Sequence, residues 1–173
     1  FARILLSYVL KVSYNFIFIF YNMKINFLLF FKYFFLLKKK LLGWPFAYIF
    51  EKFFFLKIDI FLYVGVLVPR YETSIFISKL LNIIYKNNFK KIFEFGYGSG
   101  IMSLFLISCD TMYLNGIDCD LNSLLIANKN LYNLKKKNCF FYYNNWNIFY
   151  CYNEKFDVIL SNPPYVSYKS FVI

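Results

Sequence analysis

Residues 91–100 read Lys-Ile-Phe-Glu-Phe-Gly-Tyr-Gly-Ser-Gly, and this stretch decides the fold that we expect. The apolar run Lys91–Phe95 predicts a buried strand, and Ile101–Ser108 predicts a helix directly after it. The three alternating glycines between them allow a tight turn and let a ligand approach the backbone where the helix begins. Their order, acid-x-Gly-x-Gly-x-Gly, differs from the dinucleotide-binding pattern Gly-x-Gly-x-x-Gly, in which the third glycine comes one residue later.

Strand and helix patterns occupy the rest of the chain on both sides of this loop. Upstream, Phe53–Val68 is rich in strand-forming residues and Ser74–Tyr85 has a helical pattern. Downstream, a helix is predicted at Leu124–Leu131, and strands are predicted at Met112–Ile117, Phe140–Tyr143 and Phe156–Leu160.

The last predicted strand leads into Ser161-Asn162-Pro163-Pro164-Tyr165. Two consecutive prolines stop the strand and fix the backbone, because each ring locks φ and neither residue has an N–H. Asn162 adds a side-chain acceptor and donor, and Tyr165 adds an aromatic face with a hydroxyl. This cluster is suited to gripping a planar amide or amino group by its two N–H bonds. An ordinary turn at the end of the strand is the alternative interpretation, since Asn-Pro is common in turns.

Asp118 follows the predicted strand Met112–Ile117. It comes about 20 residues after the glycine loop, where a strand-end carboxylate commonly accepts hydrogen bonds from ribose hydroxyls. A helix cap is the alternative, because Asp118, Asp120 and Asn122 all precede the predicted helix Leu124–Leu131.

The chain has 173 residues, which is enough for about one domain. Its composition is 60% hydrophobic and 25% aromatic, with 25 Phe and 17 Tyr. A/T-rich codons specify the dominant residue types, so we interpret the bias as an effect of nucleotide composition. The formal net charge of +11 has the same explanation, since Lys is one of these types. The alternative explanation of the positive charge is a surface that binds nucleic acid. We expect no stable nucleic-acid binding, because the lysines are scattered apart from Lys38–Lys40 and Lys135–Lys137.

The four cysteines form no Cys-x-x-Cys pair and the chain has no histidine, so we expect neither a metal site nor a histidine general base. Reduced thiols in a cytoplasmic protein are the simplest interpretation. Residues 1–37 are very apolar, but Lys11, Lys24 and Lys32 leave no uncharged window of ~18 residues that could span a membrane. We expect amphipathic helices there, rather than a transmembrane segment or a signal peptide.

Four segments together resemble one known family. In chain order they are Gly43-x-Pro45-x-x-Tyr48-Ile49, Val66-Leu67-Val68-Pro69-Arg70-x-Glu72-Thr73, the glycine loop, and Asn162-Pro163-Pro164-Tyr165. This order resembles the HemK/PrmC family, the release-factor glutamine N(5)-methyltransferases, from Gly43 to Val166. The second segment is the most specific, because other Asn-Pro-Pro-Tyr methyltransferases lack it in that position.

The resemblance implies an α/β fold with a Rossmann-like class I methyltransferase sheet and S-adenosylmethionine as the methyl donor. It assigns cofactor binding to the loop and to residues at strand ends: Glu94, Gly96, Tyr97, Gly98, Ser99, Gly100, Asp118, Asn145, Trp146 and Asn162. It assigns the substrate amide to Asn162, Pro163, Pro164 and Tyr165, of which Asn162, Pro163 and Tyr165 are the expected catalytic residues.

The implied substrate is the glutamine side chain in the Gly-Gly-Gln motif of a peptide chain release factor. We expect the Asn162 side-chain oxygen and the Pro163 carbonyl to accept the two amide N–H bonds and to aim the nitrogen at the methyl group. This is catalysis by alignment, which needs no strong base. The expected enzyme is a cytoplasmic monomer.

The chain departs from the family pattern at a few positions. Asn145 stands where Asp is usual, Tyr97 is bulkier than usual, Tyr71 replaces a proline, and Ser74 replaces a second acid. Trp146 keeps the aromatic residue expected near adenine, although packing in the core is an equal alternative for it.

Measured against the family, the chain looks shortened at both ends. We expect a short helical region at 1–42, a β-hairpin connector at 43–70, and an incomplete methyltransferase domain at 71–173. Its four strands are expected in the spatial order 3-2-1-4, with strand 4 at an unpaired edge. Two other functions stay open: adenine N6-methylation of a flipped base in nucleic acid, and a decayed remnant without activity.

Overall fold

The structure is a computed structural model that describes residues 1–20, 22–107, 112–145 and 154–163. The chain divides into two compact units, Phe1–Glu51 and Lys52–Ile173. The predicted Pro164 and Tyr165 of the substrate grip, and Trp146, lie outside the described residues.

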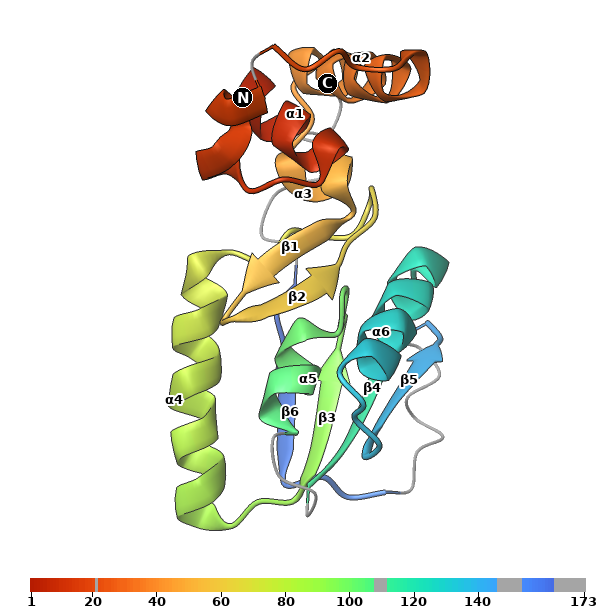
Figure 1. Cartoon of the computed structure of the whole chain (residues 1–173). Helices are drawn as coiled ribbons and strands as arrows, with labels where there is room; N and C mark the ends of the chain where they lie inside the picture. Colours follow the sequence, from red (N-terminus) through yellow and green to blue (C-terminus); the bar gives the residue numbers. More distant parts are fainter. Residues whose placement is uncertain (21, 108–111, 146–153, 164–173) are drawn as a thin grey trace. The chain divides into compact units, whose positions relative to one another are not determined.

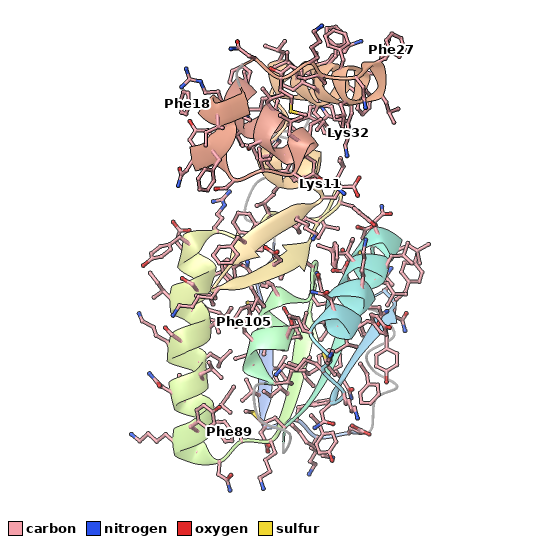
Figure 2. The ribbon with its side chains drawn as sticks, in the orientation of Figure 1. Lys11, Phe18, Phe27, Lys32, Phe89 and Phe105 are labelled. Atoms are coloured by element: carbon pink, nitrogen blue, oxygen red, sulfur yellow. The ribbon has the colours of Figure 1, made fainter. Side chains whose placement is uncertain are left out.

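The first unit is helical, as the sequence predicts. It consists of α1 (Ala2–Leu10), the short 3-10 helix η1 (Tyr14–Phe20), α2 (Phe27–Leu41) and α3 (Phe46–Phe50). Its core is built from Leu5, Val9, Leu36 and Ile49. Many of its aromatic side chains are exposed, including Phe18 and Phe27, which Figure 2 labels. Within the described residues, no helix is both long enough and apolar enough to cross a bilayer.

The second unit opens with the predicted hairpin. Strands β1 (Lys52–Phe55) and β2 (Ile58–Phe61) pair antiparallel, with Phe55 opposite Ile58. Leu56 and Lys57 between them both have positive φ, 46° and 70°, which is the backbone of a type I′ turn. The buried Phe55 makes an edge contact with Phe105 of the adjoining domain, at 5.8 Å between ring centroids; Phe105 is labelled in Figure 2. The hairpin is therefore packed onto the domain that follows it.

The main sheet is parallel and has four strands in the order β5-β4-β3-β6. This is the predicted order 3-2-1-4, which is confirmed. The chain runs through α4 (Tyr71–Asn87), β3 (Lys91–Phe95), α5 (Ile101–Leu106), β4 (Tyr113–Asp118), α6 (Leu121–Asn133), β5 (Cys139–Tyr143) and β6 (Val158–Ser161). Among the described strands β6 pairs with β3 alone, so it is the edge of the described sheet.

Helices α5 and α6 cover one face of this sheet (Figure 1). Side chains alternate between the faces of a strand, and in β3 the residues Ile92 and Glu94 point toward the helices, since Ser103 of α5 hydrogen-bonds to Glu94. Glu94, Gly116 and Phe141 occupy the same row across three strands. This row, which combines a carboxylic acid, a glycine and a large ring, lies directly beneath the glycine loop.

Candidate functional site

The sheet order reverses at β3, whose two neighbours are β4 on one side and β6 on the other. In α/β sheets of this kind, ligands bind at the carboxyl ends of the strands where the order reverses. Phe95, the last residue of β3, pairs with Ser161, the last residue of β6, and the Ser161 hydroxyl donates to the Phe95 carbonyl at 3.0 Å. Gly96 and Asn162 therefore leave the sheet at the same level, from neighbouring strands.

The glycine loop needs glycine for its backbone. Gly96, Gly98 and Gly100 have φ of 68°, 54° and 74°, in the left-handed region that other residues rarely adopt. The loop is fixed by hydrogen bonds from the Gly96 amide to the Ile117 carbonyl at 2.8 Å and from the Gly98 amide to the Asp118 carboxylate at 2.9 Å. The end of β4 thus determines the path of the loop that follows β3.

Gly100 has a second reason to be glycine, which is crowding. A Cβ at this position would lie 2.8 Å from the Cζ atom of Phe141 and 3.1 Å from the Cβ of Ala127. Gly98 is different, because the nearest atom to a Cβ there is a methyl of Val66 at 3.9 Å. The third glycine of the loop lets α5, α6 and β5 pack closely, whereas the second one leaves free space beside the loop.

Tyr97 lies in the core with only 3% of its side chain exposed. Its ring packs on Phe141 at 4.6 Å between centroids, and its hydroxyl donates to the Tyr142 carbonyl at 3.3 Å. Burial raises the pKa of Tyr97, and the charges of Asp118, Asp120 and Glu94 raise it further. A role of Tyr97 in cofactor binding stays a prediction, and it would have to come from the backbone of this residue.

Asp118 is nearly buried and both of its carboxylate oxygens accept backbone hydrogen bonds. One oxygen accepts from Gly98 and the other from the Asp120 amide, each at 2.9 Å. The N-cap of α6 is Asp120, whose side chain accepts from the amides of Asn122 and Ser123. Of the acidic residues that the sequence offered as helix caps, Asp120 therefore has that role, and Asp118 braces the glycine loop.

Glu94 is 1% exposed, and in the described part of the chain only one of its two carboxyl oxygens has a hydrogen-bond partner. Ser103 donates its hydroxyl to Oε2, whereas Oε1 has no hydrogen-bond partner among the described residues. Burial raises the pKa of Glu94 to about 8, and the nearby charge of Asp118 adds to the shift. A buried oxygen without a partner costs free energy unless a donor or a cation reaches it, so Oε1 is suited to meeting a ligand.

The remaining predicted residues follow strands β5 and β6. Asn144 donates its amide to the Asp118 carbonyl at 2.9 Å, and the Asn144 side chain accepts from the Asn145 amide at 2.8 Å. The side chains of Asn145, Asn162 and Pro163 are exposed. They are available for contacts at the carboxyl edge of the sheet.

The sequence reasoning missed buried polar residues of this region, among them Ser103 and Asn130. Ser103 is 0% and Asn130 is 1% exposed. Asn130 lies three and four residues after Ala127 and Ile126, which are both buried, so it occupies the apolar stripe of α6. A polar residue at a core position of a helical pattern is the signal that could have identified it.

The family model for the methyltransferase small domain matches residues 73–172. This chain belongs to the methyltransferase small domain family. The match spans the parallel sheet, the glycine loop and the segment after β6.

Relatives of this methyltransferase small domain chain carry the name release factor glutamine methyltransferase, in agreement with the resemblance. The protein of that name from Buchnera aphidicola subsp. Schizaphis graminum is 39% identical over 132 residues, covering 76% of this chain and 47% of the relative. The one from Buchnera aphidicola subsp. Baizongia pistaciae is 34% identical over 175 residues, covering 96% of this chain and 60% of the relative. The chain spans 47–60% of the length of these relatives.

The fold is also found in solved methyltransferase structures. The tRNA (uracil-54, C5)-methyltransferase of Pyrococcus abyssi, in complex with S-adenosyl-L-homocysteine, superposes with a TM-score of 0.53 at 15% identity. The superposition covers 65% of this chain and 28% of that chain, and at this identity it shows the fold alone.

Proposed function

We propose that this chain transfers a methyl group from S-adenosylmethionine to the side-chain amide nitrogen of the glutamine in the Gly-Gly-Gln motif of peptide chain release factors. The observation that carries the proposal is the pairing of Phe95 with Ser161. Because of this pairing, the glycine loop and the Asn162–Pro163 segment begin side by side, at the edge of the sheet where such folds bind ligands. The names of the relatives support the choice of substrate.

The residues present fit S-adenosylmethionine. Its amino group is a cationic donor. The Oε1 atom of Glu94, which has no hydrogen-bond partner among the described residues, is a buried acceptor for such a donor when the acid is ionised. Gly98 leaves space beside the backbone, and Asp118 and Asn145 stand at the ends of the next two strands as candidate partners for ribose and adenine. When bound, the sulfonium supplies an activated methyl group.

The reaction requires the substrate amide to be held in one orientation, because its nitrogen lone pair is delocalised into the carbonyl. Asn162 offers a side-chain oxygen and Pro163 offers a carbonyl, and the following residue, Pro164, has no N–H. These two acceptors take the two amide N–H bonds of the glutamine and fix its plane. The same dipoles would stabilise the positive charge that develops on nitrogen, and the nitrogen would then release its extra proton to water. Alignment therefore provides most of the rate, and no histidine is needed before the transfer.

Tyr165, two residues after Pro163 in the sequence, is proposed to pack on the amide plane and to favour a nearby cation. We assign catalysis to residues 71–173, a connecting role to 43–70 and a separate helical region to 1–42. We further propose that the protein works as a monomer in the cytoplasm, where release factors act. Light scattering on the purified protein tests the oligomeric state.

The decisive experiment measures transfer of a labelled methyl group to purified release factor. Label is expected in the wild-type factor and not in a factor whose Gly-Gly-Gln glutamine is replaced by alanine. Transfer to adenine in DNA, with the release factor unlabelled, would instead establish the nucleic-acid methyltransferase. A protein that binds no S-adenosylmethionine would refute both activities.

A further inference from the structure

Asn130 joins the hairpin to the glycine loop through a single buried side chain. Its Oδ1 accepts from the Phe61 amide at 2.6 Å, and its Nδ2 donates to the Phe61 carbonyl at 3.1 Å. The second Nδ2 hydrogen goes to the Ser99 carbonyl at 3.0 Å. The side chain thus uses both donors and its acceptor, on two segments that are 69 and 31 residues away in the sequence.

The side-chain amide of Asn130 hydrogen-bonds to Phe61 as the backbone of a neighbouring strand would. The amide of Asn130 offers Phe61 one donor and one acceptor, as a neighbouring strand would, at the end of β2 where the ladder stops. Only a primary carboxamide can supply this pair together with the extra donor for Ser99. Aspartate lacks the donors and leucine lacks all three groups.

Other contacts place the same segment against α6 and against the loop. Lys129 lies over the Phe61 ring at 4.1 Å from its centroid and donates to the Tyr63 hydroxyl at 2.7 Å. Val66 is 1% exposed and is the residue nearest to the free side of Gly98. The connector from Phe61 to Val66 therefore lies along the loop, and residues of α6 hold its first residues in place.

We propose that Asn130 is a positioning residue that fixes the glycine loop and the connector Phe61–Val66 as two walls of one cofactor site. The inference rests on the proposed function, because it assigns the loop to S-adenosylmethionine. Ser99 sits between Gly98 and Gly100, so fixing its carbonyl fixes the peptide planes of the loop. The connector is then part of the binding site, in addition to joining the hairpin to α4.

Loss of these hydrogen bonds is expected to weaken cofactor binding while the fold persists. Asn130→Asp keeps the acceptor for the Phe61 amide but sets a carboxylate against two carbonyl oxygens. We expect affinity for S-adenosylhomocysteine, measured by calorimetry, to fall roughly tenfold or more, as for the loss of one or two hydrogen bonds. Asn128→Ala is the matched control, because Asn128 is exposed on the same helix and, among the described residues, its side chain donates only to the Leu124 carbonyl of its own helix.

The readout that separates positioning from general stability is hydrogen exchange in the intact protein. In ligand-free Asn130→Asp, exchange should rise in the glycine loop, because the bond to the Ser99 carbonyl is lost, while the amides of β4 stay protected. In the wild type, S-adenosylhomocysteine should slow exchange at residues 61–66 as well as in the loop. The KM for the cofactor should rise far more than kcat falls.

Equal affinity of Asn130→Asp and the wild type would overturn the inference, and so would unchanged exchange at residues 61–66 on ligand binding. The wild-type exchange experiment needs no variant, so it decides the matter even if the substitution prevents folding. A wild type that binds no S-adenosylhomocysteine is a different result, since it refutes the proposed function; the exchange pattern of the ligand-free variant still tests the positioning of the loop.

Discussion

The Asp118 carboxylate accepts a hydrogen bond from the Gly98 amide at 2.9 Å, and thereby ties the end of β4 to the middle of the glycine loop. The two residues are 20 positions apart in the sequence. The loop is consequently shaped before any ligand arrives, which lowers the entropy that binding must overcome.

We expect Asp118→Ala to reduce both stability and cofactor affinity. It leaves the partly buried amides of Gly98 and Asp120 without their carboxylate partner, at a cost of about 1–3 kcal/mol in the free energy of unfolding. Urea unfolding measures the first effect and calorimetry with S-adenosylhomocysteine the second. Asp120→Ala is the control, because it removes the cap of α6, worth about 1 kcal/mol, and leaves the Gly98 bond in place. Equal losses of affinity in the two variants would contradict the bracing role.

The glycines of the loop should respond differently to substitution. Gly100→Ala is expected to destabilise the fold by about 1–3 kcal/mol, because its Cβ would meet Phe141 at 2.8 Å. Gly98→Asn should be nearly neutral for stability, since asparagine tolerates a left-handed backbone and the position is open.

Gly98→Val tests the space beside the loop. A branched side chain there is strained at φ 54° and fills the volume that we assign to the cofactor. We expect it to remove detectable binding of S-adenosylmethionine in a calorimetric titration. An unchanged affinity would show that the ligand binds elsewhere.

Asn162→Ala should abolish methyl transfer and leave cofactor binding nearly intact. The side chain is exposed, so stability should change by no more than about 0.5 kcal/mol. In single-turnover assays the rate should fall by roughly 100-fold or more, the scale of losing one oriented group that stabilises developing charge. Asn162→Asp, which keeps the oxygen acceptor, should retain more activity than the alanine variant. Full activity of Asn162→Ala would refute the proposed grip.

Glu94 should make stability depend on pH. Burial raises its pKa from 4.5 to about 8, so between these values the folded chain keeps a proton that the unfolded chain releases. Its contribution is therefore complete below about pH 4.5 and is lost as pH rises toward 8, with a limiting slope of about 1.4 kcal/mol per pH unit.

Urea unfolding from pH 5 to 8 measures this slope, and Glu94→Gln should flatten it. Asp157 does not interfere, because hydrogen bonds from the Lys91 and Lys90 amides lower its pKa from 3.8 and so place its titration below this range. A slope that is identical in the wild type and in Glu94→Gln would show that Glu94 is ionised in the folded chain.

The sequence predicted the elements of the second unit well, because local patterns define them. The glycine loop and the order of the strands were expected and are present. Boundaries moved where the local signal was weak: the helix expected at Ser74–Tyr85 is Tyr71–Asn87. In a chain that is 60% hydrophobic, nearly every window has an apolar side, so periodicity indicates the type of an element better than its ends.

What could not be predicted depends on contacts between distant residues. Nothing near Asn130 in the sequence shows that it meets Phe61 and Ser99, and nothing near Ser103 shows that it meets Glu94. The sequence offered Tyr97 as a cofactor residue because of its place in the loop, whereas its buried ring follows from the space that Gly116 leaves on β4. Such outcomes depend on tertiary packing, which a single sequence does not contain.

The left-handed backbone of the loop also restricts which residues can replace its glycines. The chain has six glycines, and three of them are Gly96, Gly98 and Gly100. Each of the three has a positive φ, which residues with a Cβ rarely adopt, asparagine and aspartate excepted. Most substitutions therefore strain the turn between β3 and α5 even at Gly98, where there is room for a side chain.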